Sequence, residues 1–203
     1  MEQWENTITL RGELSGLPEF SHENHGKTFY RFYLEVERLS GALDTLPVIA
    51  ELRLLESLDL SDGSCIRVEG QVRSHNVSDS SGRHLLIFVF ASELYCEEGP
   101  AINTLRISGA ICREPTHRKT PLGREICDVM LAVPRAFRRA DYLPCILWGR
   151  MAQMVSQCHT RDIISIDGRL QSRIYNKYID DQLIERTAYE ISALTAELQT
   201  EPE

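Results

Sequence analysis

Four aromatic side chains and a set of basic residues are interleaved in the second half of the sequence. The rings belong to Phe137, Tyr142, Trp148 and Tyr175. The basic residues around them are Arg135, Arg138, Arg139, Arg150, Arg169, Arg173 and Lys177, and the segment THRKTPLGR adds Arg118, Lys119 and Arg124. Such rings stack on unpaired bases, each contributing about 1–3 kcal/mol, while guanidinium groups contact phosphates. The pattern is typical of a surface that binds single-stranded nucleic acid.

Hydrophobic alternation places most of these residues on faces turned away from a core. In the segment 142–148 the odd positions form the inward set. The outward set is Tyr142, Pro144, Ile146 and Trp148. In the next predicted strand the outward set is Asp167, Arg169, Gln171, Arg173 and Tyr175. Aromatic rings exposed on a non-core face need a functional reason; the alternative is that they cover a subunit interface or pack beneath loops.

An internal repeat organises the chain into two copies. NTITLRGELSGLP at 6–18 matches NTLRISGAICREP at 103–115, an offset of 97 residues. The same offset aligns FYLEVER with VMLAVPR and LPVIA with LPCIL, and an offset of 98 aligns VEGQVRS with IDGRLQS. We therefore predict two domains, 1–98 and 99–196, followed by a short acidic tail at 197–203.

Each copy is predicted to be an all-β unit of five strands with one short helix. In the second copy the strands are expected near 103–111, 124–134, 142–148, 162–176 and 184–194. Between the third and fourth strands, apolar residues at spacing i, i+3, i+4 and i+7 predict a helical face from Met151 to Cys158. This element order favours two tandem OB-folds, which are five-stranded Greek-key barrels. A small β-sandwich is the alternative, although sandwiches seldom carry a helix at that point.

Charge is divided unevenly between the two copies. Residues 1–98 hold 8 Lys/Arg and 17 Asp/Glu, a net charge of −9, whereas residues 99–196 hold 14 and 10, a net charge of +4. The chain as a whole carries −8, which argues against a uniformly basic nucleic-acid binder. Binding needs only a local patch, however. The positive potential belongs to the copy that carries the rings.

Other reactive residue types do not form a catalytic or metal-site pattern. The six cysteines are scattered without a Cys-x-x-Cys pair, and most lie in apolar runs, so we expect reduced core thiols in a cytoplasmic protein. His22 and His25 lie in a polar loop that we expect to bind no metal. No Gly-rich phosphate loop or nucleophile–base signature occurs, so we expect neither a cofactor nor an enzyme. We also expect no membrane span and no signal peptide.

The segment CDVMLAVPRAFRRADYLPCILWGRMAQM, followed by IDGRLQSRIYNK and TAYEISA, resembles the core of the bacterial single-stranded DNA-binding (SSB) family. That family has a strand ending in Leu-Ala-Val, a Trp/Phe-Gly-Lys/Arg-x-Ala block and a Gly-x-Leu-x-x-Arg strand. The resemblance covers nearly all of 103–194. It implies sequence-tolerant, salt-dependent binding of single-stranded DNA in replication, recombination or repair. It also implies that the family's four base-stacking positions fall on Phe137, Tyr142, Trp148 and Tyr175.

The first copy lacks all four of these rings. At the repeat offset, Ser40, Thr45, Glu51 and Val77 stand in their places. The apolar alternation of the core is retained. We therefore expect residues 1–98 to form a degenerate OB-fold that has kept the fold, lost the stacking surface and serves assembly.

The resemblance also implies an assembly. Family members gather four barrels, and members with two barrels per chain do so as dimers, which predicts a homodimer with two competent barrels. The family's acidic tail recruits other proteins through an apolar tip, which LTAELQTEPE lacks, so we do not expect recruitment through this tail. The alternative function is that of a primosome-type accessory protein with the aromatic face as a protein interface. Stacking reads DNA and RNA alike, which leaves that choice open.

Overall fold

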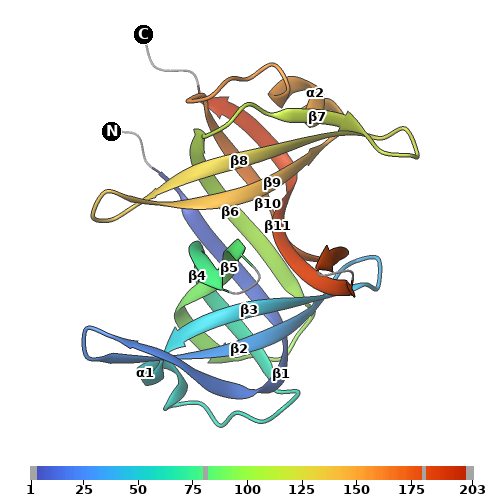
Figure 1. Ribbon diagram of the computed structural model, residues 1–203. Coiled ribbons are helices and arrows are strands. Elements are labelled where there is room, and N and C mark those ends of the chain that lie inside the picture. The colour runs from blue at the N-terminus through green and yellow to red at the C-terminus, as the bar shows by residue number, and fades with distance from the viewer. Residues whose placement is uncertain (1–3, 80–81, 180–181, 200–203) are drawn as a thin grey trace.

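The computed structural model describes residues 4–79, 82–179 and 182–199, most of which lie in strands (Figure 1). In chain order the elements are β1 (Asn6–Asn24), β2 (Lys27–Glu37), β3 (Leu43–Glu51), α1 (Leu52–Leu55), β4 (Cys65–Asp79), β5 (Gly82–Cys96), β6 (Ile102–Ile111), β7 (Thr116–Lys119), β8 (Glu125–Arg135), β9 (Arg139–Trp148), α2 (Arg150–Val155), β10 (Ile163–Ile179) and β11 (Gln182–Gln199).

Each half of the chain closes into a five-stranded barrel. In the first barrel, β1 pairs with both β2 and β4, β2 with β3, β4 with β5, and a parallel contact between β3 and β5 completes the ring. In the second barrel, β6, β8, β9, β10 and β11 pair in the same way, with β9 and β11 parallel, and β7 extends the edge beside β8. The predicted fold of two tandem OB-fold barrels is confirmed.

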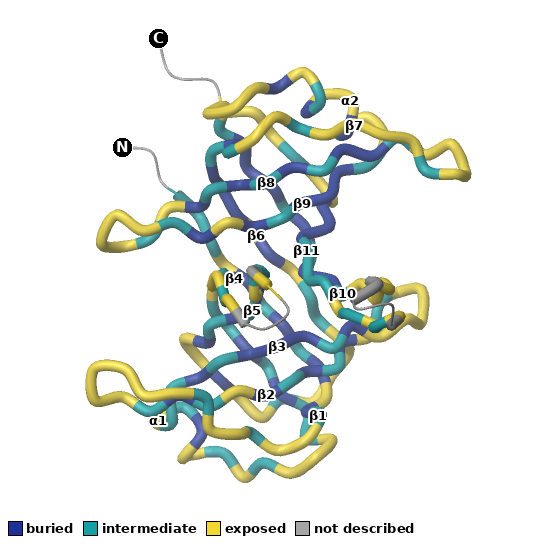
Figure 2. The backbone as a smooth tube through the Cα atoms, viewed as in Figure 1, coloured by how far each residue is buried: buried dark blue, intermediate teal, exposed yellow. Residues whose placement is uncertain are grey.

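The core of each barrel follows the predicted alternation. On β8, Val129, Leu131 and Val133 are buried, and on β9 the inward residues Leu143 and Leu147 are fully buried. Figure 2 shows the buried residues running through the middle of the strands, with exposed residues concentrated in the connecting turns. Because side chains alternate along a strand, the residues between these core positions must face outward.

The helix of the second barrel is shorter than the apolar spacing predicts. α2 ends at Val155, and Cys158 is buried from the turn that follows it. Met154 is 36% exposed, and the fully buried side chains of this helix are Val155, as predicted, and the small Ala152. A pattern built on large apolar residues overlooks such an alanine. Within the described ranges, no helix is both long and apolar enough to cross a membrane.

The cysteines do not all lie in the core, contrary to the prediction. All six are free thiols, but only Cys127, Cys145 and Cys158 are buried, and Cys96, at the end of β5, is exposed. Burial raises the pKa of Cys127 to about 11, so that thiol stays protonated at neutral pH.

The predicted tail also begins later than expected. β11 continues to Gln199, and residues 200–203 lie outside the described chain.

The two barrels are joined by the pairing of β1 with β6, which produces one eleven-stranded sheet. Asn6 pairs with Ile107, and Leu10 pairs with Asn103. Because Asn6 corresponds to Asn103 and Leu10 to Ile107 in the repeat, exchanging the two copies leaves this register unchanged. The barrels are therefore related by an approximate two-fold axis, as in an isologous dimer.

Two buried aspartates reinforce this junction reciprocally. Asp44, on β3, accepts hydrogen bonds from the backbone N–H and the hydroxyl of Ser172 on β10, at 2.6 and 3.0 Å. Its repeat counterpart Asp141, on β9, accepts one from the backbone N–H of Ser74 on β4, at 2.8 Å. Both carboxylates are at most 1% exposed. We call the junction formed by these Asp44–Ser172 and Asp141–Ser74 contacts the seam.

Each aspartate at the seam also has a basic partner. The Arg38 Nε donates to Asp44 at 2.7 Å, and this ion pair raises the pKa of Arg38. Asp141 lies 3.5 Å from Arg135 and 3.7 Å from Arg73. A buried charge is tolerated only when it is paired and hydrogen-bonded, and these contacts satisfy that condition.

We predict that Asp44→Ala lowers the free energy of unfolding by about 3–5 kcal/mol, because it leaves Arg38 and the Ser172 N–H without their partner. Urea denaturation of the full chain measures this loss. Glu37→Ala, at an exposed position on β2, is the matched control and should change stability by no more than about 0.5 kcal/mol. Equal losses in the two variants would contradict a special role for the seam.

Candidate nucleic-acid interface

A groove of ≈930 Å³ lies on the outer face of the second barrel, and we call it the C-terminal groove. Strands β7 to β11 and the connections beside them supply most of its lining. Six arginines line it: Arg38, Arg113, Arg118, Arg124, Arg169 and Arg173. Its lining contains two acidic residues, Asp128 and Glu190. The lining therefore carries four more positive than negative charges, in a chain whose net charge is −8.

The apolar wall of this groove comes from the outer face of β9. Trp148, Ile146 and Pro144 lie at alternate positions of that strand and all line the groove. Ile126 is paired with Trp148 across β8 and β9 and adds to the same wall. Ile146 and Ile126 are buried although they are not part of the barrel core. The groove thus combines a half-buried indole and aliphatic side chains with guanidinium groups.

The arginines of the groove differ in how fully they are paired. Arg118 donates to Asp128 at 2.6 Å, and Arg173 lies 3.8 Å from Glu190. Within the ranges that the structure covers, the guanidiniums of Arg113, Arg124 and Arg169 have no acidic partner, and the Nε of Arg169 is buried without a hydrogen bond. A buried unsatisfied donor costs about 1–3 kcal/mol. These groups are therefore available to an anionic ligand.

The four predicted stacking residues are all accessible, but only Trp148 lines the groove. Tyr142 is 44% exposed on the same outer face of β9, and its backbone N–H donates to the Ser74 hydroxyl at the seam, at 2.8 Å. A strand rises about 3.3 Å per residue, so Tyr142 lies roughly 20 Å along β9 from Trp148.

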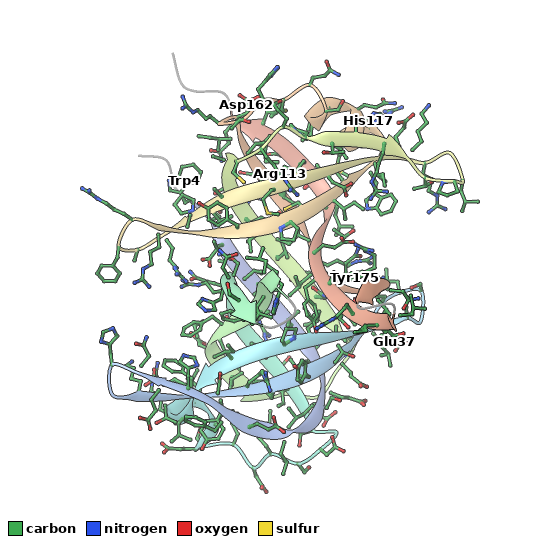
Figure 3. The ribbon with its side chains drawn as sticks, viewed as in Figure 1. Trp4, Glu37, Arg113, His117, Asp162 and Tyr175 are labelled. Atoms are coloured by element: carbon green, nitrogen blue, oxygen red, sulfur yellow. The ribbon has the colours of Figure 1, made fainter. Side chains whose placement is uncertain are left out.

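The other two rings, those of Phe137 and Tyr175, also lie outside the C-terminal groove. Phe137 is 95% exposed in the β8–β9 turn, with a left-handed φ of 61°. Tyr175, labelled in Figure 3, is 38% exposed on β10, with the guanidinium of Arg173 5.7 Å from its ring centroid. The four rings therefore do not share one groove; they follow β9 from the groove to the β8–β9 turn, with Tyr175 on β10.

The predicted basic residues divide into two groups. Arg118, Arg124, Arg169 and Arg173 line the C-terminal groove. The remainder lie outside it: Arg135 beside Asp141, Arg138 in the β8–β9 turn, Arg139 at the start of β9, Arg150 at the start of α2, and Lys119 paired with Glu125 at 2.9 Å. The side chain of Lys177 lies outside what the structure describes. Asp167, predicted to share the outward face of Arg169, instead lies 3.2 Å from Arg106 on the joined sheet.

Arg38 and Arg113 are groove residues that the sequence pattern missed. Arg113 follows β6 in the segment that leads to the basic β7 hairpin. Arg38 belongs to the first barrel and reaches the groove because its guanidinium also donates to the Ser172 carbonyl, at 2.9 Å. It is the repeat counterpart of Arg135, and that correspondence is the signal that could have found it. In the part of the chain covered by the structure, no group of three His, Cys, Asp or Glu residues could hold a metal.

Comparison with known proteins places these features in a family context. Residues 102–199 match the model of the single-strand binding protein family. The chain is 33% identical over 82 residues to single-stranded DNA-binding protein 2 of Streptococcus agalactiae, covering 37% of this chain and 63% of that protein. It is 28% identical over 100 residues to single-stranded DNA-binding protein B of Bacillus subtilis, covering 43% of this chain and 88% of that protein. The chain thus spans less than two thirds of the Streptococcus relative.

A solved structure resembles the whole chain. The wild-type single-stranded DNA binding protein from Thermus aquaticus superposes with a TM-score of 0.79 at 23% identity, covering 99% of this chain and 96% of that one. This likeness extends over both barrels, so it supports the tandem arrangement as well as the fold of each barrel.

Proposed function

We propose that the chain, whose residues 102–199 match the model of the single-strand binding protein family, binds single-stranded DNA through the C-terminal groove. Binding is tolerant of sequence and serves replication, recombination or repair. It takes place in the cytoplasm, where the six free thiols remain reduced. The protein acts by binding rather than by catalysis.

The observation that carries this proposal is the meeting of Trp148 with six arginines in one groove. A double-stranded ligand hides its bases, whereas a single strand presents both a flat base and a charged backbone. The indole of Trp148 offers a stacking face, and Ile146 and Pro144 continue the apolar wall toward the next base.

The phosphate backbone is held by the arginines that face the same groove. Arg113, Arg124 and Arg169 have no acidic partner among the described residues, so they contact phosphates without first breaking an ion pair. Arg118 and Arg173 must give up their ion pairs with Asp128 and Glu190 before they contact a phosphate, which reduces the net binding free energy that they contribute. No base-specific hydrogen-bond pattern is required, which accounts for sequence tolerance.

We predict that Trp148→Ala weakens binding of labelled oligo-dT by about 1–3 kcal/mol, because one base loses its stacking partner. Fluorescence anisotropy at low salt measures the affinity. Glu51→Ala is the matched control, since Glu51 is the repeat counterpart of Trp148 and is paired with Lys27 and Arg53 on the other barrel. It should bind as tightly as the parent chain.

Two outcomes would contradict the proposal. Equal losses in both variants would mean that the C-terminal groove has no special role. An unchanged Trp148 emission on addition of oligo-dT, across micromolar protein, would favour a protein interface instead.

We predict that Arg124→Ala makes the salt dependence of binding shallower by about 0.7 in the slope of log K against log [salt], since one phosphate contact is lost. Titrations at several salt concentrations give the slope. Arg53→Ala, on α1 of the first barrel, should leave it unchanged. An equal effect of the two variants would show that the charge acts at long range rather than in the groove.

We further propose that two chains associate, so that four barrels form one assembly. The face of the joined sheet opposite the barrel cores supports this proposal, since it is exposed and carries paired charges such as Arg106 with Glu5 and Asp167. A two-fold axis would bring such a face against its own copy.

For this assembly we predict a sedimenting species of twice 23.2 kDa at micromolar protein concentration. A species of 23.2 kDa under the same conditions would contradict the dimer. The groove would then act in a monomer.

A further inference from the structure

The first barrel has its own groove, which we call the N-terminal groove. It has a volume of ≈200 Å³ and is lined by His22, Ile49, Arg73, Phe88, Phe90 and Arg135. Ile49 is the repeat counterpart of Ile146, so this groove occupies the same face of its barrel as the C-terminal groove does. It is smaller than the roughly 300–1,000 Å³ of a pocket for a drug-sized ligand.

Aromatic rings line this groove at positions that the repeat comparison did not cover. Counted from the β-bulge that both long hairpins share, Phe90 stands where the second barrel has Ser192, and Phe88 where it has Glu190. The larger rings account for the smaller volume. The first barrel has therefore lost the four family rings and holds others on β5.

The rings are organised as a packed cluster. Phe29 lies beneath the groove with its ring centroid 5.8 Å from that of Phe90, and His22 stacks on Phe29 at 4.9 Å with an interplanar angle of 12°. Phe29 is buried, whereas Phe88 and Phe90 are only half-buried. The outer rings are thus supported from below and still accessible from the groove.

Two guanidiniums border the same rings, one from each barrel. The Arg73 guanidinium lies 5.6 Å from the centroid of Phe90, and Arg135 reaches the groove from β8 across the seam. Both share a single buried carboxylate, that of Asp141, at 3.7 and 3.5 Å. One positive charge therefore remains uncompensated by Asp141, and the Nε of Arg73 is buried without a hydrogen-bond partner.

We propose that the N-terminal groove is a second, composite site that takes one unpaired base together with its phosphate. A flat ring packs against Phe88 and Phe90, and the phosphate meets Arg73 and Arg135. An apolar wall beside an excess cation suits an anion that carries an aromatic ring, and a nucleotide has both. The proposal rests on the proposed function, because it assigns this groove to the same single strand.

The β8–β9 hairpin connects the two grooves. The outer face of β9 runs from Trp148 in the C-terminal groove to Tyr142 at the seam, and Arg135, at the other side of the hairpin, lies in the N-terminal groove. Phe137 and Tyr142, which lie outside the C-terminal groove, are therefore placed along the path of a DNA strand that occupies both grooves. Short DNA strands fill one groove, and long DNA strands reach the second.

The test compares two lengths of oligo-dT on the full chain. One has about 8 nucleotides, within the roughly 4–16 that one OB-fold occupies, and the other about 32. Phe88→Ala should weaken binding of the long strand by about 5- to 150-fold, the range for one stacked base, and leave binding of the short strand unchanged. Arg73→Gln should show the same length dependence. The control is Phe20→Ala, which removes a 60% exposed ring of the same barrel outside both grooves.

Each result separates this proposal from the proposed function. If Phe88→Ala binds both lengths as the parent chain does, the second site is absent while the C-terminal groove stands. If it weakens both lengths equally, Phe88 acts through the fold and the second site is again refuted; thermal melting of the variant confirms that reading. If the parent chain binds neither length, the proposed function itself fails.

Discussion

The antiparallel pairing of β1 with β6, fixed by the buried carboxylates of Asp44 and Asp141, is the constraint on which the rest of the structure depends. An OB-fold barrel leaves strand edges that must be covered or paired. Here each copy covers the other, in a register that is unchanged when the copies are exchanged. The charge of each aspartate is tolerated because an arginine of its own barrel pairs with it and a backbone N–H of the other barrel donates to it. Relative movement of the barrels would take the backbone N–H donor away from each buried carboxylate and leave it with fewer hydrogen bonds.

This junction also determines the composition of both grooves. Arg38 belongs to the first barrel and lines the groove of the second, and Arg135 does the reverse. The two grooves have diverged within this common frame. The C-terminal groove is wide and rich in arginine, whereas the N-terminal groove is narrow and filled by Phe88 and Phe90.

Much of this could be predicted from the sequence, because alternation and repetition are local signals. The inward positions Leu143 and Leu147, the accessible rings and the two-barrel fold all follow from them. The repeat marks Arg38 as the counterpart of Arg135, but its placement in the groove of the other barrel also depends on the register of β1 against β6, which the repeat does not give. A comparison limited to the four family positions also missed Phe88 and Phe90, because these rings lie at other positions on the same face of the barrel. Cys96 departs from the predicted core set because it lies at a strand end beside Glu97 and Glu98, outside the apolar runs on which that prediction rests.

The most direct measurement of the central claim is amide hydrogen exchange of the full chain with and without saturating oligo-dT. The account predicts slower exchange in the segment 113–124, which borders the C-terminal groove, and around Gly149, which follows Trp148. It predicts unchanged exchange in α1 and the connection that follows it, at 52–64, since that end of the first barrel faces neither groove. Protection concentrated in 52–64, with none in 113–124, would contradict it.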